Sequence, residues 1–279
     1  MSIEIRDLSF AYGRHQVLSD LSFEIPDRTL VNVLGHNGAG KTTFFKCLLG
    51  LLPGYKGDII VNGKDMRELS VRERAREIAY IPQTHSSVYD YEVIDVVMMA
   101  MTSDVKTFGA PKREHIERAY AALERVGVEF LARRPYTEIS GGEQQLVLIA
   151  RAIAQQAKTI VMDEPTSALD YGNTVRVLQA VRELASRDGL SIIQSTHQPS
   201  DAFLYSDKVL VINGGTLYAY GDPKDVITAD LVGAIYGVDV EVNSLYGDKV
   251  RVCVPVKEIG KLEKKGTRWY HTGKHQNES

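Results

Sequence analysis

The sequence predicts an α/β protein with a mostly parallel core sheet, and three observations support that fold class. Short apolar segments that suit buried strands alternate with longer segments that have the periodicity of helices. A glycine-rich segment, residues 35–42, lies between one such strand and one such helix. Hydrophobic residues make up 44% and charged residues 25% of the 279 residues, which is the balance of a globular chain that can bury a sizeable core.

The first 34 residues predict an antiparallel β part followed by one buried strand. Apolar runs at 3–5, 17–18 and 21–25 are separated by polar breaks, which is typical of short antiparallel strands. The run Leu30–Leu34 is almost wholly apolar and predicts a buried strand.

Helices and strands then alternate through the middle of the chain. We expect a helix over 42–52 that stops at Pro53 and Gly54, a strand at 58–61, a charged helix at 70–77 and a strand at 78–81. The pattern from 83 to 139 is mostly helical and includes a helix at 112–126, and a further helix rich in Leu, Ile and Ala follows at 143–156. Residues 84–156 are therefore expected to form a helical subdomain.

The remaining third contains two more buried strands and a change of pattern near its end. Strands are expected at 159–162 and 191–195, a helix at 174–187, and a hairpin at 209–220 that turns at Asn213-Gly214-Gly215. Two short strands, 240–242 and 250–254, are expected in the tail, and residues 260–279 are polar and expected to be loosely ordered. The chain is thus expected to consist of a main unit, residues 1–240, and a short C-terminal extension, residues 241–279.

Charge, cysteine content and hydropathy exclude several classes of protein. The formal net charge of −3 argues against a dedicated nucleic-acid binder, because such proteins normally have a basic surplus. The cysteines, Cys47 and Cys253, allow no disulfide framework or zinc spacing, so a reducing cytoplasm is the expected setting, and Cys47 is expected to be buried in a helix. No apolar run approaches the roughly 18 residues of a membrane-spanning helix. We expect a chain that does not span a membrane but can dock onto a protein that does.

The glycine-rich segment has the pattern G-x-x-x-x-G-K-[ST] of a phosphate-binding loop. Glycines let the backbone curl so that several N–H groups point at one anion, and the following helix directs the positive end of its dipole there. The lysine supplies a charge for the β and γ phosphates, and the threonine hydroxyl can bind Mg²⁺. The alternative is a glycine-rich turn with a chance lysine, but the flanking strand and helix favour a nucleoside triphosphate site. The loop consists of Gly35, His36, Asn37, Gly38, Ala39, Gly40, Lys41 and Thr42.

Two carboxylates follow the buried strand at 159–162. In open α/β sheets ligands bind at the carboxyl ends of the strands, and Asp163 and Glu164 stand at such an end. Asp163 is suited to hold Mg²⁺, and Glu164 to orient the attacking water as a general base. An acidic pair that merely caps the turn at Pro165 is the alternative, which the phosphate-binding loop disfavours.

Two other strand ends carry polar side chains. His197 follows the strand at 191–195 and would reach the same edge, where a contact with the γ-phosphate is favoured over a purely structural role. Gln83 follows the strand at 78–81 and could sense Mg²⁺ or the attacking water. Its spacing alone fits a residue with no contact to the metal or the water equally well.

Residues 139–143, Ile-Ser-Gly-Gly-Glu, resemble the signature motif Leu-Ser-Gly-Gly-Gln of ABC (ATP-binding cassette) proteins. The other landmarks of that family occur in the same order across residues 1–240, including a D-loop at 167–170. The resemblance implies an ABC-type P-loop ATPase fold with bound ATP and Mg²⁺. It implies catalysis by Glu164, His197, Gln83 and Lys41, and magnesium ligation by Thr42, Gln83 and Asp163. The nucleotide-binding residues that it implies are Tyr12, which would stack on adenine, residues 35–42 with Thr43, and the signature residues Ser140, Gly141, Gly142 and Glu143.

The resemblance also implies a head-to-tail homodimer. ATP would lie between the phosphate-binding loop of one subunit and the signature motif of the other. Ser140-Gly141-Gly142 opens a helix and is therefore a second helix start that can bind an anion. A two-fold dimer can direct both helix starts at one γ-phosphate more easily than a single chain can.

Two residues depart from the usual signature. Ile139 replaces Leu, which alters the shape but not the apolar character. Glu143 replaces Gln and puts a carboxylate in the first helical turn, where it favours the helix dipole but would repel ATP if it faced the phosphates. We expect Glu143 to point elsewhere, because turnover would otherwise be slow.

Segments 146–152, 166–173 and 236–240 resemble the importers of iron chelates, haem, cobalamin and related metal complexes. That resemblance implies an ATP-hydrolysing subunit at the cytoplasmic face of the inner membrane. It would be bound to a permease dimer that an extracytoplasmic binding protein supplies with cargo, most simply an iron-siderophore, with haem, cobalamin or molybdate as other choices. Tyr89, Tyr91 and the helical subdomain would receive the permease, although packing explains the two tyrosines equally well.

Three other readings are less well supported. A soluble non-transport ABC ATPase would carry long coiled-coil inserts or a second cassette, and an exporter half would be fused to membrane spans. A slow-hydrolysing regulatory cassette is disfavoured by the intact Lys41, Asp163 and Glu164, while Glu143 leaves it open.

Overall fold

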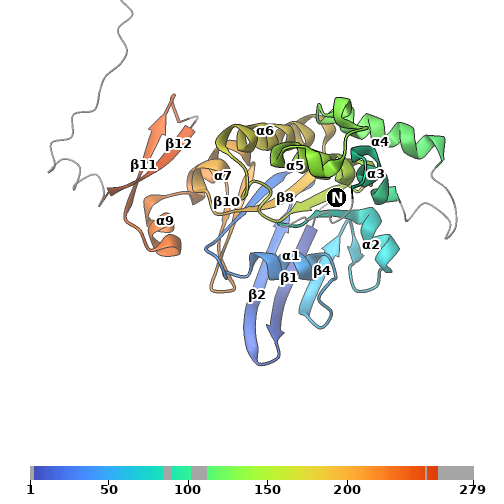
Figure 1. Cartoon of the computed structure of the whole chain (residues 1–279). Coiled ribbons are helices and arrows are strands. Elements are labelled where there is room, and N and C mark those ends of the chain that lie inside the picture. Colours follow the sequence, from blue (N-terminus) through green and yellow to red (C-terminus); the bar gives the residue numbers. More distant parts are fainter. Residues whose placement is uncertain (1–2, 84–89, 102–111, 249, 257–279) are drawn as a thin grey trace, which may run out of the picture.

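Two sheets packed around one helix form the main body of the computed structural model, which describes residues 3–83, 90–101, 112–248 and 250–256 (Figure 1). The first sheet is antiparallel, with strand order β2-β1-β4-β5. The second has the order β10-β9-β3-β8-β7-β6 and is parallel except for its edge strand β10. The predicted fold class, an α/β protein with a parallel core sheet and an N-terminal antiparallel part, is confirmed.

The strands of the first sheet are longer than the sequence pattern predicts. The apolar runs at 17–18 and 21–25 belong to a single strand, because Asp20 takes a φ of +51° where the register shifts and the strand continues beyond it. The sheet consists of β1 (Ile3–Tyr12), β2 (His15–Ile25), β4 (Lys56–Val61) and β5 (Lys64–Asp65).

The core sheet is buried on both faces, which explains its near-continuous apolar strands. On β3, Val31 and Val33 face the cluster shared with the antiparallel sheet and helix α1, whereas Leu30 faces the cluster under helices α5 and α6. Its strands are β3 (Leu30–Leu34), β6 (Ile78–Ile81), β7 (Thr159–Met162), β8 (Ser191–Thr196), β9 (Lys208–Asn213) and β10 (Thr216–Gly221).

Helix boundaries differ from the expected ones for local reasons. Helix α1 (Lys41–Leu48) ends four residues before the predicted stop, because Gly50 adopts a φ of +64° and its N–H bonds to the carbonyl of Cys47. Cys47 is fully buried, as predicted. Helices α5 (Gly141–Ala154) and α6 (Tyr171–Asp188) begin earlier than predicted, because Ser140 and Asp170 cap them.

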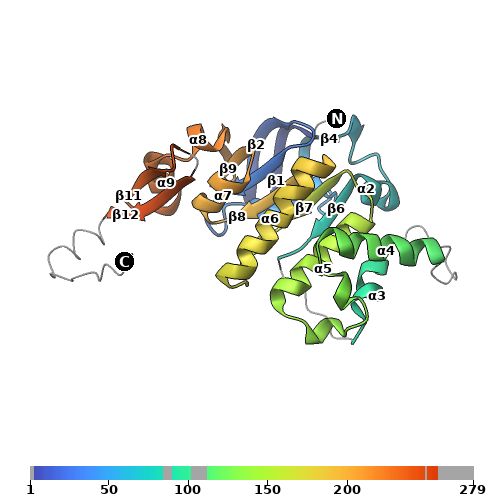
Figure 2. The ribbon, with the colours of Figure 1, turned by 90° about the horizontal axis from the view of Figure 1, so that it is seen from above.

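Helices α3 (Val93–Met98), α4 (Arg113–Arg125) and α5 pack into a separate helical group (Figure 2). Its apolar interior includes Val97, Leu123 and Val147, all fully buried. Helix α2 (Val71–Glu77), capped by Ser70, leads into β6 as the sequence predicts.

The C-terminal part contains three short helices that the sequence analysis did not predict, α7 (Pro199–Tyr205), α8 (Pro223–Val226) and α9 (Ala229–Tyr236). The two predicted strands of the tail are present as a longer antiparallel hairpin, β11 (Val240–Leu245) and β12 (Val250–Pro255). The hairpin lies at the opposite end of the molecule from α3 and α4 (Figure 2). Residues 260–279 lie outside the described residues. Among the helices that the structure describes, none combines the length and apolarity needed to cross a bilayer.

Candidate functional site

The turn between β3 and α1 is held open by glycines. Gly38 and Gly40 have φ values of +83° and +108°, which side-chain-bearing residues rarely adopt. A Cβ on Gly35 would lie 2.4 Å from the carbonyl oxygen of Ile212 on β9, so this position also has no room for a side chain. The loop can therefore take the curled shape that phosphate binding requires.

Lys41, the first residue of α1, folds back over this loop. Its side chain is 6% exposed, and its Nζ donates to the carbonyl oxygens of Gly35, at 2.7 Å, and His36, at 3.2 Å. Burial lowers the pKa of Lys41, and the charges of Glu164 and Asp163 oppose that shift. The loop therefore contains a buried cation whose nearest acidic neighbours come from another strand.

A cleft of about 440 Å³ lies over the loop. Tyr12, at the end of β1, borders it with 48% of its surface exposed, while its ring packs edge-on against Phe10. The aromatic face that could receive a base thus lies beside the loop that could receive phosphates. The cleft is lined by Tyr12, His15, Val17, Asn37, Gly38, Ala39, Gly40, Lys41, Thr42, Thr43, Gln83 and Glu164.

Asp163 lies at the carboxyl end of β7 and is only 2% exposed. It accepts one hydrogen bond from Thr42 Oγ1 and one from Ser195 Oγ, both at 2.6 Å. A buried carboxylate beside a threonine hydroxyl at the rim of the loop is an all-oxygen set, which is the donor chemistry that Mg²⁺ prefers. The residues present therefore fit a magnesium ion bound together with nucleotide phosphates.

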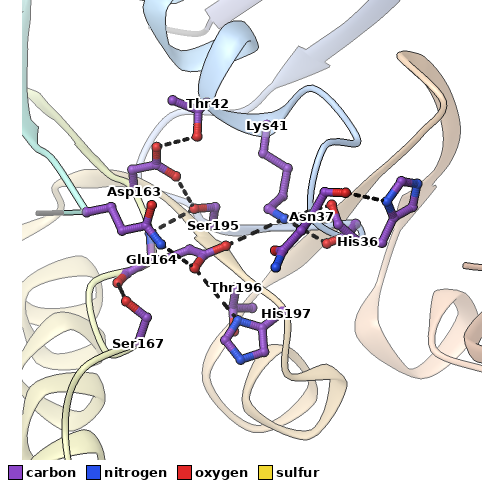
Figure 3. A network of polar contacts seen from close by, with 12 residues as sticks. His36, Asn37, Lys41, Thr42, Asp163, Glu164, Ser167, Ser195, Thr196 and His197 are labelled. Atoms are coloured by element: carbon purple, nitrogen blue, oxygen red, sulfur yellow. Dashed lines mark hydrogen bonds and ion pairs between the residues drawn. The ribbon is translucent and has the colours of Figure 1, made fainter. Parts of the chain in front are cut away.

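Glu164 is the centre of the polar network in Figure 3. Its φ of +46° is unusual for a residue with a side chain and costs on the order of 1 kcal/mol or more. Its N–H donates to Ser195 Oγ at 2.8 Å, and its carboxylate oxygens lie 3.6 Å from Lys41 Nζ and 3.8 Å from His197 Nδ1. Gln83 Nε2 donates to the same carboxylate at 2.9 Å. Three segments, which carry Lys41, Gln83 and His197, thus converge on one carboxylate beside the phosphate-binding loop.

The signature residues lie outside the cleft over the loop, at the start of α5, and Gly141 lines a neighbouring pocket together with Gln83 and Glu164. Ser140 and Gly141 are exposed, whereas Gly142 is buried. Among the described residues that line the cleft over the loop, none belongs to Ser140–Glu143. The chain therefore presents two separate helix starts to solvent rather than one closed site.

We expected Glu143 to point away from the phosphates of ATP, and in the free chain its carboxylate turns back onto Ser140 at the start of its own helix. Its Oε2 accepts hydrogen bonds from the N–H of Ser140, at 2.8 Å, and from the hydroxyl of Ser140, at 2.7 Å. In return the N–H of Glu143 donates to Ser140 Oγ at 3.3 Å. This is a capping box, which satisfies the N–H groups of Ser140 and Glu143 and so competes with any outward orientation of the carboxylate.

The start of α5 also contacts the start of α6. A Cβ on Gly142 would lie 2.4 Å from Cγ of Asn173, so the two helix starts pack directly against each other. Asn173 is held by Asp170, which accepts from both its N–H and its side-chain amide at 2.8 Å. The D-loop residues thereby support the signature segment of the same chain.

Sequence reasoning missed Ser195 and Asn173 as residues of the site. Ser195 is a fully buried hydroxyl that bonds to both acidic residues. A serine at the end of the predicted strand 191–195, two residues before His197, was the available signal. Of the two predicted docking tyrosines, Tyr91 is 41% exposed and Tyr89 lies outside the described residues.

The sequence is also similar to those of known proteins. A family model described as ABC transporter matches residues 18–167. An uncharacterised ABC transporter ATP-binding protein of Haemophilus influenzae is 40% identical over 86% of this chain and 91% of its own length. A Helicobacter pylori ATP-binding protein named for iron chelatin transport is 34% identical over 86% of this chain and 95% of its own.

The fold is also similar to that of solved structures. A metal-chelate type ABC transporter in an inward-facing conformation superposes with a TM-score of 0.81 at 31% identity, covering 91% of this chain and 97% of that one.

Proposed function

Since the chain belongs to the ATP-binding proteins of the ABC transporter family and is an ATPase, we propose that it powers the import of a metal complex through a partner permease. The observation that carries the proposal is the convergence of Lys41, Gln83 and His197 on the carboxylate of Glu164, beside a loop built to bind phosphates.

The roles of the residues follow from their positions. The N–H groups of the loop and Lys41 would bind the β and γ phosphates, and Tyr12 would stack on the base. Thr42 and Asp163 would hold Mg²⁺, with Gln83 as a further ligand, and the ion would neutralise charge on the phosphates. Glu164 would orient a water molecule and accept its proton. His197 would contact the γ-phosphate.

The separation of the loop from the signature supports a head-to-tail homodimer. In such a dimer, Ser140 and Gly141 of one copy would meet the γ-phosphate held by the other. The N–H groups at the start of α5 would then add to the donors of the loop, and closure of the dimer would depend on ATP. Closure and reopening would move the permease between its two states.

The cargo class rests on the relatives. Proteins named for iron chelatin, hemin, molybdate and cobalamin import are 33–35% identical to this chain. We propose an iron chelate as the cargo and the cytoplasmic face of the inner membrane as the location. An extracytoplasmic binding protein would deliver the cargo to the permease.

The catalytic part of the proposal is tested with Glu164→Gln. The variant should keep ATP binding but lose hydrolysis by at least about 100-fold, because a neutral amide cannot accept the proton of water. It should also accumulate as a dimer in Mg-ATP, as measured by sedimentation velocity. An unchanged rate of phosphate release would remove Glu164 from its role.

The binding part is tested with Lys41→Ala, for which Lys46→Ala on the same helix is the matched control. Loss of the loop cation should weaken the binding of a fluorescent ATP analogue by about 100-fold or more. Lys46 lies on the last turn of α1 and does not line the cleft, so its removal should leave the affinity near that of the wild type. Equal affinities for the two variants would contradict the loop assignment.

The transport part requires the membrane partner. The partner permease should co-purify with this chain in detergent. After reconstitution into vesicles, the complex should take up a labelled iron chelate only with Mg-ATP and an intact Glu164. Activity with hemin, molybdate or cobalamin in place of the chelate would reassign the cargo. Full ATPase activity without any membrane partner or uptake would favour a soluble ABC ATPase.

A further inference from the structure

The hydroxyl and N–H of Ser140 already have an anionic partner within their own chain. Both donate to one oxygen of Glu143, at 2.7 and 2.8 Å. Ser140 is nevertheless exposed, so the same donors face solvent, where a second subunit would approach. The proposed function assigns these donors to the γ-phosphate of ATP held by that subunit.

The carboxylate and the phosphate cannot both use these donors. A serine hydroxyl has one proton to donate, and here it is directed at Glu143. The hydrogen bonds from Ser140 lower the pKa of Glu143, so the carboxylate is ionised at neutral pH. A γ-phosphate that approaches Ser140 would therefore meet a like charge as well as an occupied hydroxyl.

We propose that Glu143 is a built-in competitor of the γ-phosphate, which must release Ser140 before the ATP-bound dimer can close. This inference rests on the proposed function and deepens it. It adds a free-energy cost to dimer closure, because the hydrogen bonds between Ser140 and Glu143 must break first. The helix start of α5 is stabilised in the free subunit, and the stabilisation is given up on assembly. Glu143 thereby restrains closure of the dimer.

The chain contains a matched control for this contact. At the start of α2, the N–H and hydroxyl of Ser70 donate to Glu73 Oε2 at 2.9 and 2.6 Å, and Glu73 N–H donates to Ser70 Oγ at 3.3 Å. The residue types and their spacing match those of Ser140 and Glu143, and both serines are exposed. Ser70 and Glu73 line neither the cleft over the loop nor the Glu164 network.

The experiment measures the dissociation constant of the Mg-ATP dimer by sedimentation equilibrium in the non-hydrolysing Glu164→Gln background. Glu143→Gln keeps the length of the side chain and the capping geometry but removes the charge. Because the dimer contains two such contacts, this variant should lower the dissociation constant by about tenfold. Glu73→Gln should leave it within about twofold of the parent, and Glu143→Ala should act in the same direction as Glu143→Gln.

The outcomes separate this inference from the proposed function. If Ser140→Ala weakens the dimer while Glu143→Gln leaves its dissociation constant unchanged or raises it, the competition is overturned and the dimer stands. If Glu73→Gln tightens the dimer as much as Glu143→Gln does, the effect is one of net charge and the competition is likewise overturned. If the Glu164→Gln parent does not dimerise in Mg-ATP, the proposed function itself fails, and this inference with it.

Discussion

At the scale of single residues, Ser195 links the two halves of the acidic pair. Its hydroxyl donates a hydrogen bond to Asp163 and accepts one from the N–H of Glu164. Ser195 and Asp163 are both buried. The backbone of Glu164 has a left-handed φ, which a hydrogen bond to its N–H helps to hold. Ser195 is therefore a positioning residue for both carboxylates.

Replacement of Ser195 by Ala should reduce both stability and turnover. The partly buried N–H of Glu164 and a buried carboxylate oxygen of Asp163 lose their partner, which should cost about 1–3 kcal/mol in urea unfolding. Because Glu164 loses its anchor, ATP hydrolysis should fall by about tenfold.

Ser191→Ala is the matched control on the same strand. Its hydroxyl accepts from Arg28 N–H at 3.0 Å and donates to Asp27 at 3.2 Å, at the end of β8 that is remote from the carboxylates. This variant should lose stability but hydrolyse ATP at the wild-type rate per folded molecule. Equal losses of turnover in the two variants would show that Ser195 acts only through stability.

At the scale of elements, several of the described helices begin with a side-chain cap that the sequence encodes locally. They include α2 at Ser70, α5 at Ser140, α6 at Asp170 and α9 at Thr228. The starts of α5 and α6 then touch through Gly142 and Asn173. That contact joins the signature segment to the D-loop, because Asn173 is bonded to Asp170. The D-loop in turn follows Glu164 closely in the chain.

Gly142→Ala should destabilise this junction. The new methyl group would lie 2.4 Å from Cγ and 2.7 Å from Cβ of Asn173, so one helix start must move. Such overpacking should lower the free energy of unfolding by about 1–3 kcal/mol, as measured in urea.

Gly141→Ala is the control, because the nearest heavy atom to its new Cβ would be Leu169 Cδ2 at an ordinary 3.6 Å. Its free energy of unfolding should change by less than about 1 kcal/mol. If both variants unfold at the same urea concentration, the two helix starts are not in the close contact described.

At the scale of the whole molecule, burial of weak acids makes stability depend on alkaline pH. Burial raises the pKa of a thiol, ordinarily 9.0, and of several phenols, ordinarily 10.0, to about 12. These groups are Cys47, Tyr55, Tyr80, Tyr136, Tyr220 and Tyr236. Above pH 9 the unfolded chain loses protons that the native chain retains. The unfolded chain is therefore stabilised relative to the native chain as the pH rises.

The free energy of unfolding should therefore be constant with respect to these groups below pH 9 and should fall as the pH rises toward 12. Urea unfolding at pH 8, 9, 10 and 11 measures this slope. Tyr55→Phe should make the slope shallower, because the buried hydroxyl of Tyr55 has no hydrogen-bond partner among the described residues and its removal deletes the titrating group without breaking such a bond. A free energy that does not change between pH 9 and pH 11 would contradict the prediction.

The sequence by itself determined the features that depend on neighbouring residues. The loop at 35–42, the apolar strands β3 and β7 and the acidic pair after β7 were predicted, because backbone freedom and burial leave local patterns of composition and period. The same holds for the charged helix α2 and the strand β6 that follows it. The C-terminal helices α7 to α9 were missed, because each is short and carries little periodicity.

Only the tertiary structure decided which of these features meet. Thr42 and Asp163 are 121 residues apart and touch because the sheet order places β3 and β7 on either side of β8, an order that local patterns do not encode. The same order brings Ser195 between the two carboxylates.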